Sequence, residues 1–209
     1  MFKIVNTLLL LTVLFTACSG QESKEKAETN TTKIKETVAD TNVTKTVSDT
    51  NVTVKEKEQK SLFTLTTLEG KTIHIDETEG GLSFKEFKDK VVLVLFFGHR
   101  CPPCLREIPV LTELTKKGHK DLEIIAVEVQ GLSEEQLKTF KEMKGINYNL
   151  VANTGTSNFV NYIAKQANWG GAIPFLIGFD KKSVVKIVHA GGLGEKDFDN
   201  IYESLAKGE

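Results

Sequence analysis

The chain has 209 residues, of which 40% are apolar, enough for the core of one ordinary globular domain. Its formal net charge is −1, so the composition indicates neither a nucleic-acid-binding surface nor a polybasic membrane patch. There are three cysteines, an odd number that leaves at least one of them outside any internal disulfide.

Residues 1–17 have the pattern of an export signal. Lys3 supplies a positive start, and residues 4–15 form a largely apolar run, shorter than the roughly 20 residues of a membrane-spanning helix. Small residues then precede Cys18, which resembles the lipobox of bacterial lipoproteins, although Phe15 stands where that family usually has leucine. The resemblance implies a periplasmic protein that is lipid-anchored through Cys18 to the cell membrane or the outer membrane. The alternative is an ordinary signal peptide with an incidental cysteine.

Residues 18–60 are predicted to form a disordered tether behind the lipid anchor. From residue 19 onward the segment contains no aromatic residue and no leucine, and its lysines and acids balance. Such a composition buries too little apolar surface to offset the entropy lost on folding. A nine-residue segment is repeated in tandem at 37–45 and 46–54. Two copies are too few for a solenoid, so the repeat is interpreted as duplicated linker.

Three Asn-x-Thr tripeptides, at Asn30, Asn42 and Asn51, lie in this tether, each with an acidic residue two positions earlier. The pattern resembles the extended acceptor site of bacterial oligosaccharyltransferases, which implies glycosylation of the three asparagines. The alternative is that a duplicated segment rich in Thr, Asn and acids contains such tripeptides by chance.

Residues 61–209 are predicted to form one α/β domain. Short strand-like runs at 62–67 and 71–76 indicate an N-terminal β-hairpin extension. Continuous apolar runs at 91–97 and 122–129 indicate strands buried on both faces of a sheet. Further helices are expected at 102–117, 133–143, 157–167 and 195–207, and further strands at 147–151, 175–179 and 184–189. This order predicts a central mixed sheet flanked by helices.

Cys101 and Cys104 lie between the first buried strand and its helix, where open α/β sheets place their chemistry. A cysteine at a helix N-terminus is favoured as the thiolate, and His99 and Arg100 add positive charge beside it. Cys101 can then attack a disulfide of another protein, and Cys104, one turn further along, can resolve the mixed disulfide. The pair therefore predicts a thiol–disulfide oxidoreductase that acts on protein thiols and disulfides, with no cofactor besides its own redox-active disulfide.

The cysteine pair has two alternative uses. A structural disulfide is possible in an oxidising compartment, although a loop this short adds little stability. Half of a zinc site would need two further ligands, and the four histidines are scattered along a chain with no second cysteine pair. No metal site is therefore predicted.

The segment Phe96–Pro109, with its Cys-Pro-Pro-Cys core, resembles the active-site signature of TlpA/ResA-type thioredoxins. The resemblance spans residues 61–209 and implies a thioredoxin-like fold. In that family an Ile-Pro before a later strand forms a cis-proline loop that packs against the disulfide and pairs with the substrate backbone. The resemblance assigns this role to Ile173 and Pro174. This sequence differs from the family signature at Arg100, where the family usually has tryptophan.

The group that carries protons for Cys104 differs from the one in thioredoxin itself. Leu95 stands where thioredoxin has a buried aspartate. TlpA/ResA-like proteins often carry a glutamate just after the next strand, which makes Glu128, beside Gln130, a candidate modulator of the cysteine pKa. The alternative is that Glu128 is an exposed or strand-edge acid. Trp169, the only tryptophan, is expected either to line the substrate groove or to pack in the core.

The resemblance implies a membrane-tethered reductase of extracytoplasmic protein disulfides, with apocytochrome c as the usual client of such relatives. A periplasmic reductase needs electrons from a membrane thiol carrier, since that compartment is kept oxidising. Two alternatives remain open: an oxidase or isomerase of folding proteins, and a non-catalytic lipoprotein that keeps the fold with a structural disulfide.

Overall fold

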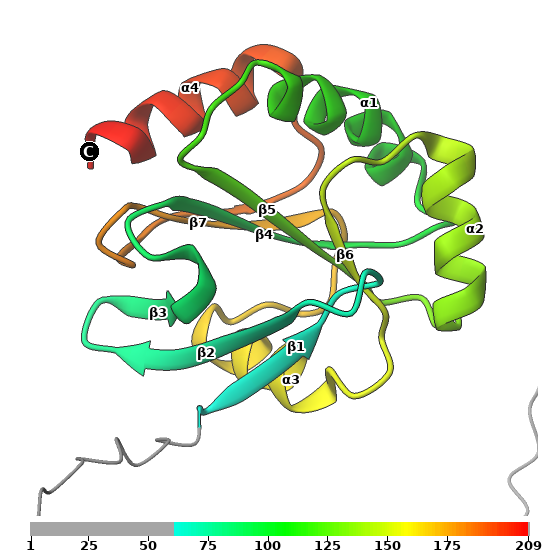
Figure 1. The fold of residues 1–209 in the computed structure, drawn as a ribbon, viewed down its shortest axis with the longest axis horizontal. Coiled ribbons are helices and arrows are strands. Elements are labelled where there is room, and N and C mark those ends of the chain that lie inside the picture. Colours follow the sequence, from blue (N-terminus) through cyan, green and yellow to red (C-terminus); the bar gives the residue numbers. More distant parts are fainter. Residues whose placement is uncertain (1–60, 209) are drawn as a thin grey trace, which may run out of the picture. The chain divides into compact units, whose positions relative to one another are not determined.

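The computed structural model describes residues 61–208 of the chain (Figure 1). The predicted signal sequence (1–17) and tether (18–60) lie outside the described residues. So do the predicted lipidation site Cys18 and the predicted glycosylation sites Asn30, Asn42 and Asn51.

A five-stranded mixed sheet forms the centre of the fold, with the strand order β6-β5-β4-β7-β8. The strands β4, β5 and β6 run parallel, whereas β7 is antiparallel to β4 and β8 is antiparallel to β7. This arrangement confirms the predicted central sheet. The strands span Val91–Phe97 (β4), Leu122–Glu128 (β5), Asn149–Val151 (β6), Phe175–Phe179 (β7) and Val185–Ala190 (β8).

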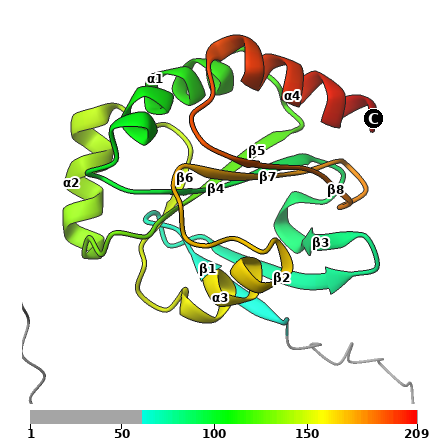
Figure 2. The same cartoon turned by 180° about the vertical axis from the view of Figure 1, so that it is seen from behind.

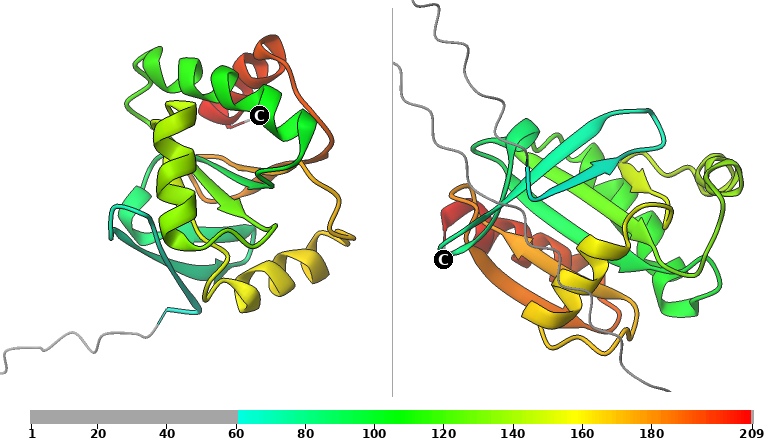
Figure 3. Two further views of the ribbon diagram at one scale, coloured as in Figure 1. Left: turned by 90° about the vertical axis from the view of Figure 1, so that its right-hand side faces the viewer. Right: turned by 90° about the horizontal axis from the view of Figure 1, so that it is seen from below.

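Four helices cover the two faces of this sheet (Figures 1 and 2). On one face, α1, α2 and α4 pack over alternate residues of β4 such as Leu93 and Leu95. On the other face, α3 packs over Val94 and Phe96, and the left view of Figure 3 shows it on the opposite side of the sheet from α1. All seven residues of β4 are buried, as a strand covered on both faces requires. The helices span Pro102–Lys116 (α1), Glu134–Lys144 (α2), Ser157–Gln166 (α3) and Glu195–Lys207 (α4).

The N-terminal hairpin of β1 (Phe63–Thr66) and β2 (Thr72–Thr78) is confirmed, but it is part of a three-stranded antiparallel sheet. The unpredicted third strand is β3 (Gly81–Phe84), followed by the short 3-10 helix η1 (Lys85–Phe87). Only two of its four residues are buried apolar side chains, which is too short a pattern to recognise in sequence. This small sheet and α3 share one core beneath the central sheet.

Candidate active site

Cys101 and Cys104 form a disulfide in the turn from β4 into α1, with their Cα atoms 5.3 Å apart. Cys101 is the N-cap residue of α1, and Pro102 and Pro103 occupy the first two helical positions. Proline fits there because its fixed φ suits a helix and the N–H it lacks would have no partner within the helix. Both cysteines are buried, at 6% and 2% exposure.

The two prolines determine which amides can reach the Cys101 sulfur. Since neither proline has an N–H, the first donor in the helix is the amide of Cys104, whose nitrogen lies 3.3 Å from Cys101 Sγ. The next amide, that of Leu105, donates to the carbonyl of Cys101 instead. A thiolate on Cys101 therefore receives one backbone hydrogen bond from the first turn of α1.

The loop before β7 faces the disulfide. The Ile173–Pro174 peptide bond is cis, and the carbonyl oxygen of Ile173 lies 3.6 Å from Cys101 Sγ. The carbonyl of Pro174 accepts the N–H of Gly191, which connects the loop to the segment before α4. The structure thus brings Ile173 and Pro174 to the position that the resemblance implied.

Trp169 packs in the core beneath this loop, as expected in the second of the two positions considered for it, the substrate groove and the core. It is 8% exposed, and its ring lies 4.7 Å from that of Phe175 and 4.8 Å from that of Phe96, measured between centroids. Its indole N–H donates to the carbonyl of Ala172 at 2.7 Å. The tryptophan therefore supports the loop before Pro174 from below.

Glu128, at the end of β5, is completely buried, so the alternative that it is an exposed acid is wrong. Its Oε1 accepts hydrogen bonds from His99 Nδ1 at 2.9 Å, from the amide of His99 at 3.4 Å and from the amide of Gln130 at 3.0 Å. Its Oε2 accepts from the amides of Gly131 at 2.8 Å and Leu132 at 3.0 Å. Burial opposes ionisation, yet the hydrogen bonds from His99 and the backbone hold the pKa of Glu128 below its usual range.

Glu128 and Gln130 together hold the segment that leads into Cys101. Gln130 Oε1 accepts the amide N–H of Arg100 at 2.8 Å, and its side chain lies where a Cβ on residue 98 would be, so any larger residue than Gly98 would displace Gln130. The amide of Cys101 donates to the carbonyl of Gly98 at 3.1 Å. The three amides of residues 99–101 are thus all bonded. We call Glu128 and Gln130 the loop bracket.

The loop bracket changes the interpretation of Glu128. Both oxygens of its carboxylate are occupied by five N–H groups of two loops. Such a carboxylate holds the chain before Cys101 in place through these hydrogen bonds. His99 is half-buried against it and Arg100 is exposed.

Glu107, on α1 one turn beyond Cys104, is a buried acid that sequence reasoning missed. It is 3% exposed, and its Oε1 accepts the amide N–H of Leu193 at 2.8 Å. Burial raises the pKa of Glu107 to about 7, against the opposing effects of that hydrogen bond and of Arg106. The available signal was its spacing, because Glu107 shares the buried face of α1 with Cys104, Ile108 and Leu111.

Two further features concern membranes and metals. None of the helices within residues 61–208 is long and apolar enough to cross a membrane. In the same part of the chain, no group of three or more His, Cys, Asp or Glu side chains is placed to hold a metal ion.

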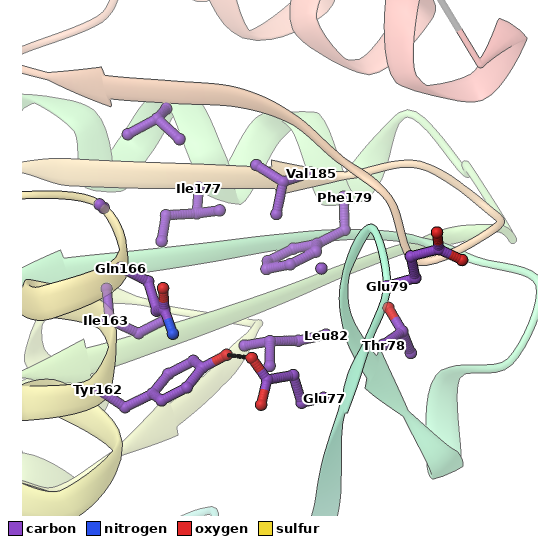
Figure 4. Close-up of a pocket in the computed structure, with 13 residues that line it drawn as sticks. Glu77, Thr78, Glu79, Leu82, Tyr162, Ile163, Gln166, Ile177, Phe179 and Val185 are labelled. Carbon is purple, nitrogen blue, oxygen red and sulfur yellow. Dashed lines mark hydrogen bonds between the residues drawn. The ribbon is translucent and has the colours of Figure 1, made fainter.

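A separate pocket of about 240 Å³ lies between the N-terminal sheet, α3 and the β7–β8 hairpin (Figure 4). Its walls combine apolar side chains, such as Ile163, Ile177 and Phe179, with polar ones, and Tyr162 donates to Glu77 at 2.8 Å. None of the residues that line it belongs to the turn around Cys101 or to the Ile173–Pro174 loop. The pocket therefore adds nothing to the chemistry of the disulfide.

Comparisons with known proteins agree with this geometry. The model of the AhpC/TSA family matches residues 57–188. A "Thiol-disulfide oxidoreductase ResA" from Bacillus cereus is 33% identical over 129 residues, which cover 60% of this chain and 65% of the relative. The protein of the same name from Bacillus thuringiensis subsp. konkukian is 30% identical over 150 residues, covering 69% of this chain and 73% of the relative.

The fold has solved counterparts. The crystal structure of a thiol:disulfide interchange protein of the thioredoxin family from Chlorobium tepidum TLS superposes with a TM-score of 0.57 and 23% identity. The match covers 68% of this chain and 92% of that protein. It shows that the arrangement of the sheet and helices is thioredoxin-like.

Proposed function

The chain belongs to the AhpC/TSA family and is a thioredoxin-like thiol–disulfide oxidoreductase of the ResA type, and from this premise we propose that it is an extracytoplasmic reductase of protein disulfides. One observation carries the proposal: the Cys101–Cys104 disulfide lies at the N-terminus of α1, with the Ile173 carbonyl 3.6 Å from the Cys101 sulfur. An edge of loop backbone next to the sulfur is suited to receive the extended backbone of a client protein.

The reaction begins from the dithiol state. The Cys101 thiolate attacks one sulfur of a client disulfide, and the other client sulfur leaves as a thiolate and is protonated. The Cys104 thiolate then attacks the Cys101 sulfur of the mixed disulfide and releases the second client thiol. Two electrons have passed to the client, and the Cys101–Cys104 disulfide remains. A membrane thiol carrier would return the protein to its dithiol state.

We propose that Glu107 accepts the proton of the Cys104 thiol. Its pKa of about 7 lets the carboxyl group exchange a proton near neutral pH, as a general base must. It lies one turn beyond Cys104 on the same buried face of α1. Glu128 is less suited because five N–H groups already occupy its carboxylate.

The hydrogen bonds to Cys101 support the reducing direction. A thiolate that receives one backbone donor is stabilised less than one at a helix N-terminus with all its amides free. A less stable dithiol state gives up its electrons more readily. The opposite direction, an oxidase or isomerase, has one observation in its favour, because His99 and Arg100 place positive charge immediately before Cys101.

The place of action and the partners are also part of the proposal. The lipobox-like sequence before Cys18 supports a periplasmic lipoprotein anchored to the cell membrane or the outer membrane. From the resemblance to TlpA/ResA-type proteins we infer that apocytochrome c is a client and that a membrane thiol carrier is the electron donor. From the Asn-x-Thr tripeptides with an acidic residue two positions earlier, we infer that Asn30, Asn42 and Asn51 are glycosylated. A mass spectrum of the native protein tests both modifications, since diacylation at Cys18 and glycans at the asparagines each add a defined mass.

The reduction potential of the Cys101–Cys104 couple tests the direction of electron flow. The full chain would be equilibrated with dithiothreitol or glutathione buffers, and the oxidised fraction measured. A value near or below about −250 mV supports the reductase, whereas about −120 to −180 mV would instead identify an oxidant or isomerase. A Cys104→Ser variant separates both from a binding lipoprotein, because an enzyme lacking Cys104 accumulates mixed disulfides with its clients and a binding protein forms none.

A further inference from the structure

Three chain segments meet around the disulfide: residues 98–104, 169–174 and 190–193. The Ile173 carbonyl lies against the Cys101 sulfur, and the Gly191 amide bonds to the Pro174 carbonyl. A Cβ added to Gly192 would lie 3.4 Å from that of Pro103. We call these segments the disulfide rim.

The disulfide rim carries positive charge and no negative charge. Its residues are mostly glycine, proline and apolar, and its basic side chains are His99 and Arg100. None of the three segments contains an aspartate or a glutamate. Of the two buried acids behind the rim, Glu107 accepts the amide of Leu193, and Glu128 accepts backbone amides and is paired with His99 at 2.9 Å, which leaves Arg100 as the rim's uncompensated cation. A client cysteine that approaches Cys101 therefore meets a cationic rim.

Arg100 is the exposed cation of this rim. Within residues 61–208 its guanidinium group forms no hydrogen bond or ion pair. Some cations elsewhere in the domain are paired, since Lys117 contacts Asp199 at 2.6 Å and Lys181 contacts Asp121 at 2.5 Å. The guanidinium of Arg100 is thus available to a carboxylate from another molecule.

The position of Arg100 is determined by the loop bracket. Its amide donates to Gln130 Oε1 at 2.8 Å, and the residues on either side are held by Glu128 and by the carbonyl of Gly98. The side chain therefore starts from a fixed point directly before the nucleophilic cysteine. The backbone of Arg100 therefore does not have to be ordered when its side chain binds, which lowers the entropy lost on binding.

We propose that Arg100 selects client proteins that carry an acidic side chain within two residues of their reactive cysteine. This inference rests on the proposed function and names the class of client. Guanidinium and carboxylate form paired, charge-assisted hydrogen bonds, and the planar fork of arginine fits the carboxylate better than lysine does. The net charge of the chain is −1, so the preference arises from this local contact rather than from general attraction of acids.

The test compares client peptides that differ only in flanking charge. Symmetrical disulfide dimers of a short peptide are prepared with Glu, Gln or Lys on both sides of its cysteine. The pre-reduced full chain reduces each dimer in a single turnover. Each rate is divided by that with dithiothreitol, because flanking charges also change the intrinsic reactivity of the cysteine. At low ionic strength, the normalised rate for the Glu dimer is expected to exceed that for the Lys dimer by about tenfold, since two exposed charges are attracted in one case and repelled in the other.

Three variants locate the effect. Arg100→Gln is expected to reduce the Glu-to-Lys ratio to within about twofold, and Arg100→Glu to reverse it. Lys120→Gln removes the same charge from an exposed residue before β5, at the opposite end of that strand from Glu128, and is expected to leave the ratio unchanged. Raising the salt to about 0.5 M should suppress the preference of the wild type.

The outcomes separate the inference from the function on which it rests. Equal normalised rates for the three dimers, or a ratio that Lys120→Gln lowers as much as Arg100→Gln does, would overturn the role of Arg100 and leave the reductase intact. A folded, pre-reduced protein that reduces none of the dimers would overturn the proposed function, and this inference with it.

Discussion

At the scale of single residues, Glu128 shows why a carboxylate and not an amide is needed at the end of β5. Both of its oxygens accept N–H groups, so a glutamine would turn its own NH₂ toward donors. We expect Glu128→Gln to lower the free energy of unfolding by about 2–4 kcal/mol, because buried donors lose their partners. Urea denaturation measures this. Glu113→Gln, which changes an exposed acid on α1, is the control and should cost less than about 0.5 kcal/mol.

Glu107 makes the stability of the protein depend on pH. Its pKa is about 7 in the folded protein, above the ordinary value of 4.5, so between these values the folded state keeps a proton that the unfolded state has released. Stability therefore falls as the pH rises through this window, and the full penalty applies above it. Glu107→Gln removes the penalty and keeps an acceptor for the amide of Leu193.

The expected result is a stability gain in Glu107→Gln that is smallest near pH 4.5 and reaches up to about 3 kcal/mol at pH 8. Urea denaturation of the variant and the wild type at several pH values measures it. A difference that does not change with pH would show that the carboxyl group of Glu107 ionises normally in the folded protein.

At the scale of the elements, the start of α1 determines how well the Cys101 thiolate is stabilised. The side chain of an N-cap residue accepts the N–H of the second or third helical residue, and the second here is Pro103. Pro103→Ala adds that missing donor. We expect it to stabilise the dithiol state and to raise the reduction potential by about 15–30 mV. This shift corresponds to a change of about three- to tenfold in the equilibrium constant for thiol–disulfide exchange.

Pro102→Ala is the matched control for this prediction. It restores an N–H at the first helical position, which is not one of the two that bond to an N-cap side chain. Its potential should stay close to that of the wild type. Equal shifts in both variants would mean that loop stiffness, rather than the number of donors, sets the potential.

The elements also show which features can be predicted from sequence. The seven apolar residues of β4 and the capping residue Ser133 of α2 are local signals, and both elements lie where they were expected. β3 was not expected, because its pairing with β2 and the close approach of Gly81 to the Ser183 carbonyl are contacts between distant residues. The burial of Glu128 and of Glu107 could not be predicted for the same reason. Burial of a charged side chain depends on partners such as His99 and Leu193 that only the fold brings near.

At the scale of the whole domain, the two hydrophobic cores support different parts of the active site. Cys101 and Cys104 belong to the core on the α1 face, together with residues of β4, α2 and α4. The core on the other face joins the N-terminal sheet to α3 and contains Trp169, which supports the loop of Ile173 and Pro174. The central sheet lies between them. The disulfide therefore belongs to one core, whereas the loop that faces it contacts both cores through Ile173.

Because the disulfide belongs to a core, its redox state is linked to the stability of the whole domain. In a thermodynamic cycle, the oxidised protein is the more stable form when its cysteine couple is more reducing in the folded protein than in the unfolded chain. Proteins that are strong oxidants are instead more stable in the reduced form. The reductase proposal thus predicts that the oxidised chain unfolds at higher urea than the reduced chain. About 1.4 kcal/mol of added stability corresponds to each 30 mV of difference between the folded and unfolded couples.

Urea denaturation with and without dithiothreitol measures this difference in stability, and a Cys101→Ser/Cys104→Ser variant should show no response to the reductant. A reduced form more stable than the oxidised one would make the couple an oxidant, and the direction of electron flow proposed for this protein would then be reversed.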